Sequence, residues 1–295
     1  MLSIIITSYK EPLTIRKAVD SFLKQDIREK YEIIVLAPDK ETAEVVKKAY
    51  KNNKKVIYIK DPLKGKPTAL NIAFKKARGQ ILILSDGDVY TSENSVNYLV
   101  KHFKNKKVGA VSGRPISLNE KTNILGYWSH LLTDIGAHET RLLWTKKNKF
   151  IVCSGYLMTI RKGIINSIPE NSLADDAVIS HLIYGKGYKI EYEPNAKVYV
   201  KYPTTFKDWI KQKKRSAGGY NQLKNLIQNK ETMRSFTRES IEVFRALRYP
   251  KNIKEFIWTI ALIIARLYLW ILIFIEINIK KEKFENIWTR VESTK

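Results

Sequence analysis

The chain has 295 residues, of which 44% are hydrophobic and 11% aromatic. This composition fills the core of one large domain or two small ones and excludes a disordered or low-complexity chain. Its 53 Lys and Arg side chains outnumber 29 Asp and Glu side chains and give a formal net charge of +24. Such a charge indicates a polyanionic partner (an anionic membrane surface, a phosphorylated substrate or a nucleic acid) or a Lys-rich surface without one.

The single cysteine, Cys153, excludes an internal disulfide framework and a zinc ribbon. We expect it to be a small buried residue. The opening segment MLSIIITSYKEP combines a short apolar run with neither a basic start nor a small-residue cleavage site. We therefore expect no signal peptide and a cytosolic catalytic part.

Strand and helix patterns alternate along the N-terminal third. The predicted strands cover residues 2–7, 32–36, 56–59 and 80–84, and the predicted helices cover residues 14–25, 41–50 and 68–77. This order predicts an α/β fold with a doubly wound, mostly parallel sheet. Ligands of such sheets bind beyond the carboxyl ends of the strands. Polar or acidic residues follow three of these strands, at 7–9, 37–39 and 85–88.

The pattern changes near residue 109. The expected elements are strands at 108–112, 150–160 and 189–192, a long helix at 123–145, a helix after Asp175 and Asp176, and a basic helical segment from 203 to 230. The run 256–275 then holds thirteen Ile, Leu or Phe residues and one charge, Arg266. Roughly −0.5 kcal/mol for each apolar residue outweighs about +3 for a central Arg and favours a membrane span. A buried core helix and a helix in the membrane interface are the alternatives.

Two carboxylates, Asp86 and Asp88, directly follow the fourth predicted strand. They lie two residues apart, so both can project into one cleft and hold Mg²⁺ or Mn²⁺ together with a diphosphate. Such a cation would act as a Lewis acid on a departing nucleoside diphosphate. The alternative is an ordinary Asp-Gly-Asp turn.

A second acidic pair, Asp175 and Asp176, precedes a predicted helix. Adjacent side chains diverge, so we expect at most one of them to point into a cleft, where it could serve as a general base. The alternative is a helix N-cap at Asp175.

Two basic segments could bind phosphate. Gln212 and Arg215 share one face of a basic helix, and an Arg there could grip a diphosphate through two hydrogen bonds. The segment 64–71 is a Gly-containing basic turn that opens a helix. A solvated basic face is the alternative for the first, and the second lacks the spacing of a P-loop.

In this order and spacing, the motifs resemble glycosyltransferase family 2, inverting enzymes with the GT-A fold, over roughly residues 1–230. The resemblance is strongest to the membrane-associated branch of cellulose, chitin and hyaluronan synthases, because Gln212 and Arg215 match its Gln-x-x-Arg motif. It implies a nucleotide-sugar-binding half at 1–110, an acceptor and catalytic half at 111–235, and a basic helical tail at 236–295 that contains the apolar run.

The resemblance also assigns roles to individual residues. It implies nucleotide-sugar binding by Ser8, Tyr9, Glu11, Asp39, Lys66, Asn71 and Asp86. It implies metal binding by Asp86 and Asp88, with Mg²⁺ or Mn²⁺ as cofactor. Asp176 would be the base, beside Asp175. Ser154, Gly155, Gln212 and Arg215 would serve the diphosphate and the acceptor.

Three departures from the family pattern narrow the expectation. Ser216 replaces the Trp that ends Gln-x-x-Arg-Trp, Ala37 and Pro38 replace an Asp pair, and a single apolar segment follows the catalytic part. We therefore expect single transfers from a UDP- or GDP-sugar to a lipid-linked or glycan acceptor at the cell membrane. The catalytic domain would face the cytoplasm, and no nucleic acid would be a partner.

Two other classes of protein remain as alternatives. A nucleotidyltransferase would usually carry a Gly-rich loop after the first strand, where this chain has Ser8-Tyr9-Lys10-Glu11. A non-catalytic protein that binds membranes or nucleic acid would explain the charge but not the acidic strand ends. His130, Asp134 and His138 are spaced as on one helix face, but amphipathicity explains that helix, so we do not predict a zinc site there.

Overall fold

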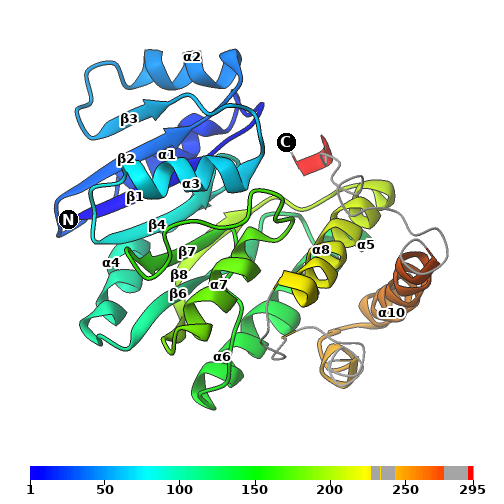
Figure 1. Ribbon diagram of the computed structural model, residues 1–295. Coiled ribbons are helices and arrows are strands. Elements are labelled where there is room, and N and C mark those ends of the chain that lie inside the picture. Colours follow the sequence, from blue (N-terminus) through cyan, green and yellow to red (C-terminus); the bar gives the residue numbers. More distant parts are fainter. Residues whose placement is uncertain (227–232, 234–242, 276–291, 295) are drawn as a thin grey trace.

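The computed structural model describes residues 1–226, 233, 243–275 and 292–294 (Figure 1). Its strands are β1 (Leu2–Thr7), β2 (Tyr31–Leu36), β3 (Val56–Ile59), β4 (Ile81–Asp86), β5 (Tyr90–Thr91), β6 (Val108–Ser117), β7 (Leu157–Arg161) and β8 (Lys189–Val200). Its α-helices are α1 (Ile15–Leu23), α2 (Lys40–Ala49), α3 (Lys66–Lys76), α4 (Ser95–Val100), α5 (Ile124–Leu131), α6 (Thr140–Lys146), α7 (Asp175–Gly185), α8 (Phe206–Leu226) and α10 (Ile253–Phe274). Short 3₁₀ turns lie at Lys101–Lys104 and Glu292–Thr294.

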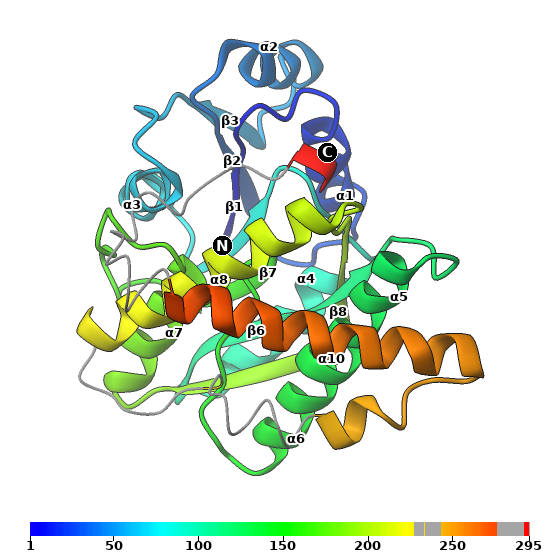
Figure 2. The same ribbon diagram turned by 90° about the vertical axis from the view of Figure 1, so that its right-hand side faces the viewer.

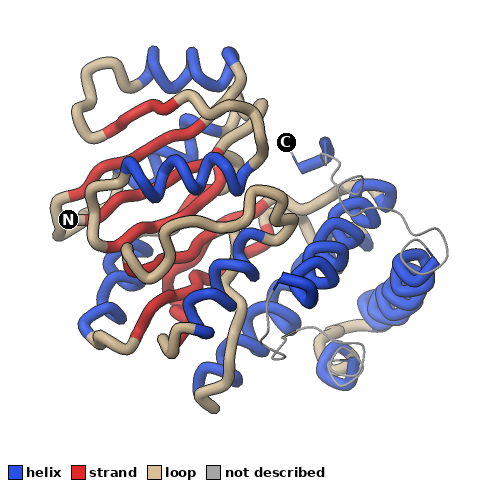
Figure 3. The backbone as a smooth tube through the Cα atoms, viewed as in Figure 1, coloured by secondary structure: helices blue, strands red, loops and turns tan. Residues whose placement is uncertain are grey.

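All eight strands form one sheet in the order β3-β2-β1-β4-β7-β6-β8-β5 (Figure 3). The first four run parallel, as the alternation of strands and helices predicts. β7 then runs antiparallel to both β4 and β6, β8 is parallel to β6, and β5 is antiparallel to β8. The sheet is therefore a parallel N-terminal half joined to a mixed C-terminal half.

Helices cover both faces of the sheet, so the doubly wound fold is confirmed. Alternate residues of the central strands point to opposite faces, and each face has its own apolar core. One core includes side chains of α3 and α7, and the other includes side chains of α1, α2 and α4. Every residue of β1 is buried, as expected of a strand covered on both sides.

A third apolar cluster joins α5, α8 and α10 beside the sheet (Figure 2). The long helix expected at 123–145 is one helical stretch, but its middle, Leu132–Glu139, winds as a π-helix between α5 and α6. π-Helical segments interrupt α-helices and cannot be recognised from apolar spacing alone.

The strand expected at 150–160 is wrong in its first part, since only Leu157–Arg161 pairs in the sheet. Side chains satisfy the backbone of the preceding residues instead of a neighbouring strand. The N–H groups of Cys153 and Ser154 donate to Ser180 Oγ at 3.0 Å and Ser112 Oγ at 2.9 Å. Cys153 is fully buried, as expected. This loop leads directly into the site described next.

Candidate active site

The polar strand ends predicted to form a site do meet at the carboxyl edge of the sheet. Thr7, the last residue of β1, is the register partner of Asp86, the last residue of β4. The Thr7 hydroxyl donates to Asp86 Oδ1 at 3.3 Å. The site is therefore anchored where two neighbouring parallel strands end.

The turn after β1 packs tightly against the Asp86–Asp88 turn. Ser8 Oγ donates to Glu11 Oε2 at 2.7 Å, and both residues are buried. A Cβ atom at Gly87 would lie 2.3 Å from Ser8 Oγ and 2.5 Å from Glu11 Oε2. Only glycine therefore fits between the two turns, and Ser8 and Glu11 help to fix the position of the two carboxylates.

Asp39, which follows β2, contacts the turn after β1. Its carboxylate caps α2 by accepting from Thr42 N at 2.9 Å, and it accepts from Lys10 N at 2.8 Å. Although burial raises the pKa of Asp39, these hydrogen bonds outweigh it, so the pKa is lowered. Tyr9 is half-buried next to this junction, with Lys10 Nζ 5.5 Å from its ring centre.

The structure gives Asn71 a task other than the nucleotide contact that the resemblance implies. Its amide nitrogen donates to Ile168 O at 2.8 Å, and its amide oxygen accepts from Ile168 N at 2.8 Å. Asn71 is buried, and these two hydrogen bonds tie α3 to the segment before α7.

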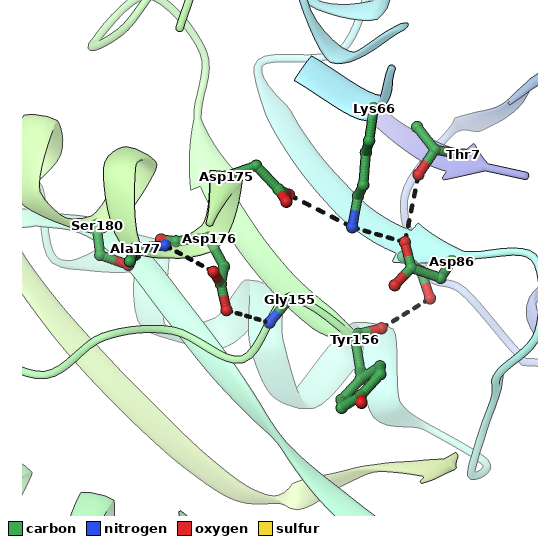
Figure 4. Close-up of polar contacts among 10 residues, drawn as sticks. Thr7, Lys66, Asp86, Gly155, Tyr156, Asp175, Asp176, Ala177 and Ser180 are labelled. Carbon is green, nitrogen blue, oxygen red and sulfur yellow. Dashed lines mark hydrogen bonds and ion pairs between the residues drawn. The ribbon is translucent and has the colours of Figure 1, made fainter. Parts of the chain in front are cut away.

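The ammonium group of Lys66 lies between two carboxylates, those of Asp86 and Asp175, at the centre of the site (Figure 4). Lys66 Nζ is 2.7 Å from Asp86 Oδ1 and 3.3 Å from Asp175 Oδ2. Burial opposes a charge on Lys66, but Asp175 and Asp86 outweigh it and raise the pKa of its ammonium group. Burial also raises the pKa of Asp86, and the charge of Asp88 adds to that effect while Lys66 opposes it.

Asp176 lies beside this group on α7. Its Oδ2 accepts from Gly155 N at 3.1 Å and its Oδ1 accepts from Ala177 N at 2.8 Å. Burial and the charge of Asp175 raise the pKa of Asp176. Asp175 is the first residue of α7 and Ala174 its N-cap, so the N-cap alternative for Asp175 is wrong. Both carboxylates have partners at the site, so the expectation that at most one would point there is also wrong.

The helix that carries Gln212 and Arg215 packs beside the start of α7. Gln222 Oε1 accepts from Leu173 N at 2.9 Å. A Cβ atom at Gly219 would lie 2.7 Å from Ala174 Cβ, so α8 approaches this segment closely. Gln212 and Arg215 lie two turns and one turn before Gly219, on the same side of α8. Both side chains are half-buried.

The sequence patterns did not single out Tyr156. Its carbonyl accepts from Ser85 Oγ at 2.9 Å, and its ring packs edge-on against Tyr202 with centres 6.1 Å apart. Burial raises the pKa of its phenol, Arg215 opposes this, and Asp88, Asp86 and Asp176 add to it. Tyr156 is therefore within electrostatic reach of the charged residues of both halves. Its place directly after Ser154 and Gly155 was the available signal.

The residues fit a divalent cation bound together with a substrate phosphate. Asp86 and Asp88 are hard oxygen donors at the end of β4, and the negative charge of Asp88 already acts on Asp86. Mg²⁺ typically takes one or two protein carboxylates and completes its shell with phosphate oxygens and water. Within the described ranges, no group of three His, Cys, Asp or Glu side chains is placed to hold a metal by itself.

Separate hydrogen bonds engage the three side chains that are spaced as on one helix face, His130, Asp134 and His138. His130 Nε2 lies 2.6 Å from Asn119 O, and His138 Nδ1 lies 2.8 Å from Tyr192 Oη. Asp134 Oδ2 accepts from the Tyr249 hydroxyl at 2.7 Å. The three side chains therefore have three different partners.

The family model described as Glycosyl transferase family 2 matches residues 3–167. Among curated proteins, poly-beta-1,6-N-acetyl-D-glucosamine synthase of Staphylococcus aureus (strain COL) is 26% identical over 229 residues, which cover 74% of this chain and 54% of that protein. The probable glycosyltransferase YdaM of Bacillus subtilis is 28% identical over 243 residues, which cover 77% of this chain and 57% of that protein. The chain thus spans about half the length of the curated relatives it matches.

Solved structures show the same fold. The mannosyltransferase PcManGT from Pyrobaculum calidifontis, in complex with GDP-Man and Mn2+, superposes with a TM-score of 0.61 at 19% identity, covering 98% of this chain and 82% of that one. TarS 1-349 of S. aureus, in complex with UDP-GlcNAc, gives a TM-score of 0.53 at 15% identity and covers 83% and 79%. These likenesses confirm the GT-A fold that the sequence motifs imply.

Proposed function

The chain belongs to glycosyl transferase family 2, and from this premise we propose that it moves a sugar from a nucleotide-sugar donor to an acceptor hydroxyl with inversion at the anomeric carbon. Family membership favours this reaction over the nucleotidyltransferase and over the non-catalytic binding protein. The observation that carries the proposal is the arrangement of two acidic groups. Asp86 ends β4 and Asp88 follows it by two residues, while Asp175 and Asp176 open α7, and Lys66 bridges Asp86 and Asp175 (Figure 4).

Asp176 is the proposed general base. A carboxylate takes a proton from an acceptor hydroxyl more readily when its pKa is raised toward the working pH, and burial and Asp175 raise the pKa of Asp176. The hydrogen bond from Gly155 N at 3.1 Å fixes its orientation. Once deprotonated, the acceptor oxygen attacks the anomeric carbon from the side opposite the leaving diphosphate, so inversion occurs in one step.

Asp86 and Asp88 would hold Mg²⁺ or Mn²⁺, which supplies Lewis-acid stabilisation of the leaving diphosphate when bound. Arg215 is the proposed cationic partner of the diphosphate from α8, because a guanidinium can pair with two phosphate oxygens. Ser8, Tyr9, Glu11 and Asp39 surround the neighbouring strand ends, where the nucleoside is proposed to bind. Gln212, Ser154 and Gly155 lie on the side proposed for the acceptor.

The proposed acceptor is a glycan or a lipid-linked sugar at a membrane, and α10 supports this choice. Among the described residues, α10 is the one helix long and apolar enough to cross a bilayer. Its buried residues recur every three or four positions, at Thr259, Leu262, Ala265, Leu269 and Ile273. Leu262 and Ala265 belong to the apolar cluster shared with α5 and α8, and α10 contacts both of these helices, beside which it lies in Figure 2.

We therefore propose that α10 lies in the plane of the membrane interface. A spanning helix would have to leave the domain or take α5 and α8 with it into lipid. The side of α10 that faces away from the domain is apolar: Phe256, Ile257, Ile260, Ile264, Leu267, Ile271 and Phe274 are all exposed. A contiguous exposed apolar surface of this kind is typical of a site of contact with a membrane or a partner protein. The cytoplasmic face is the proposed location.

A donor panel tests the function. The protein is mixed in detergent with UDP-, GDP- and dTDP-sugars, with Mn²⁺ or with EDTA, and nucleoside diphosphate release is measured. Since general base catalysis contributes about 10²–10⁴-fold, Asp176→Asn should lose turnover by about that factor and keep donor binding. Asp88→Ala should lose metal-dependent donor binding.

Asp26→Asn is the matched control, because Asp26 is exposed and remote from the site. It should behave like the wild type. A loss below tenfold in Asp176→Asn would remove Asp176 from the role of base. Failure of every donor to bind in the presence of metal would refute the proposed reaction.

A further inference from the structure

The ion-pair bridge made by Lys66 joins the two halves of the site. Lys66 is the first residue of α3, Asp86 the last of β4 and Asp175 the first of α7. Its ammonium nitrogen is 2.7 Å from Asp86 Oδ1 and 3.3 Å from Asp175 Oδ2. The side chains of Lys66, Asp86 and Asp175 are 30%, 22% and 18% exposed. The bridge is thus partly shielded yet open to an incoming ligand.

The Lys66 ammonium group partly neutralises a cluster of four aspartates. Asp88 and Asp175 act on Asp86, and Asp175 acts on Asp176, each raising the pKa of the affected carboxyl group. Lys66 opposes both effects. The Lys66 ammonium group lies within 3.3 Å of both Asp86 and Asp175, so its positive charge offsets their negative charges.

Lys66 thereby competes with a divalent cation. Asp86 is one of the two carboxylates proposed to hold the metal, and its Oδ1 is already paired with an ammonium group. Two cations close to one carboxylate repel each other strongly in a partly buried site. A bound diphosphate changes this balance, because it offers Lys66 a second anion next to the start of α3, where backbone N–H groups also favour phosphate.

We propose that Lys66 is an exchangeable counter-ion, which neutralises Asp86 and Asp175 in the empty cleft and transfers to the donor's diphosphate when the divalent cation binds Asp86. This inference rests on the proposed function, because the incoming anion is the diphosphate of a nucleotide sugar. Lysine suits such an exchange, since its ammonium is a point charge on a flexible four-carbon stem. Lys66 is in this sense a positioning residue that makes binding of metal and of nucleotide depend on each other.

The proposal predicts opposite effects on two ligands from one substitution. Lys66→Met removes the competing cation, so Mn²⁺ alone should bind about tenfold more tightly than to the wild type. It also removes the partner of the diphosphate in the metal-loaded site, so UDP or GDP at saturating Mn²⁺ should bind about tenfold more weakly. A lysine that only supports the fold would weaken both ligands when replaced.

The test measures free Mn²⁺ by electron paramagnetic resonance without nucleotide, and UDP and GDP binding by calorimetry at saturating Mn²⁺. Lys64→Met is the matched control, because Lys64 is an exposed lysine of the same turn and the change in net charge is equal. Lys66→Arg keeps the cation and should leave Mn²⁺ affinity near that of the wild type. If Lys66→Met does not fold, Lys66→Gln replaces it.

Tighter Mn²⁺ binding together with weaker nucleotide binding in Lys66→Met, and neither change in Lys64→Met, supports the exchange. Unchanged or weaker Mn²⁺ binding in Lys66→Met, while the wild type still binds nucleotide with metal, overturns the exchange and leaves the proposed function standing. If the wild type binds neither UDP nor GDP even with Mn²⁺ present, the proposed function fails and the exchange fails with it.

Discussion

Asp175 and Asp176 are neighbours in the chain, yet their carboxylates have different partners. Asp175 faces the Lys66 ammonium at 3.3 Å, whereas Asp176 accepts hydrogen bonds from the N–H groups of Gly155 and Ala177. The Asp175 charge therefore acts on Asp176 without blocking its lone pairs. The two adjacent aspartates therefore differ in role: Asp175 pairs with Lys66, which also contacts Asp86, and Asp176 is the proposed base.

This division predicts a pH effect of Asp175→Asn. Burial raises the pKa of Asp176 most and the Asp175 charge raises it further, so removing that charge lowers the pKa. The base acts only when deprotonated, and activity is lost as the pH falls through its pKa. The acidic limb of kcat/KM against pH should therefore move to lower pH in Asp175→Asn. A limb that stays in place or moves to higher pH would contradict this coupling.

At the scale of elements, the site depends on two segments whose geometry the apolar patterns do not reveal. The loop before β7 leaves the sheet because Ser112, Ser180 and Asp176 accept from its backbone N–H groups. The second segment is α8, whose Gly219 lets the helix approach Ala174 directly before Asp175. Both segments place residues of the candidate site through contacts distant in the sequence.

The close approach of α8 can be tested at Gly219. A Cβ atom there would lie 2.7 Å from Ala174 Cβ and 3.2 Å from Ala174 N, and overpacking of this kind costs about 1–3 kcal/mol. Gly219→Ala also gains about 1 kcal/mol of helix propensity, so the free energy of unfolding should fall by up to about 2 kcal/mol, and transfer should fall as well. The control is Gly136→Ala in the π-helix, where an added Cβ meets nothing within 4 Å and the better helix propensity of Ala favours it. Equal stability of the two variants would show that α8 can move away.

Over the whole molecule, the fold of residues 1–110 could be predicted from sequence more fully than the fold of residues 111–235. The strands β1 to β4 pair within a regular βαβ order, and the strand predicted at 56–59 matches β3 residue for residue. In the second half β7 inserts antiparallel between β4 and β6, and β8 continues to Val200 well beyond the expected 192. These pairings join residues far apart in the chain, and hydrophobic periodicity carries no information about them.

The same limit applies to the site. Asp86, Asp175 and Asp176 could be singled out because acidic residues at element ends are visible in the sequence. The Lys66 bridge, the Asn71 contacts with Ile168 and the position of Tyr156 depend on tertiary packing. Composition could also show that 256–275 is apolar enough for a membrane, but only packing against α5 and α8 distinguishes the two sides of α10.

The proposed membrane contact predicts where substitutions should matter. Ile264 and Ile271 are 61% and 58% exposed on the outer side of α10, and burying each in lipid is worth about 1.5–3 kcal/mol. The double change Ile264→Glu, Ile271→Glu should therefore reduce flotation with vesicles of phosphatidylcholine and phosphatidylglycerol more than tenfold while leaving the thermal unfolding temperature unchanged. Leu13→Glu is a control for the introduction of one such charge elsewhere, because Leu13 is 92% exposed on another surface. The net charge of +24 should make binding stronger to anionic than to neutral vesicles and weaker in high salt.

A helix that lies in the interface contacts lipid on one side only, so alkaline carbonate should release the wild type from vesicles. Resistance to that extraction would instead show that α10 crosses the bilayer.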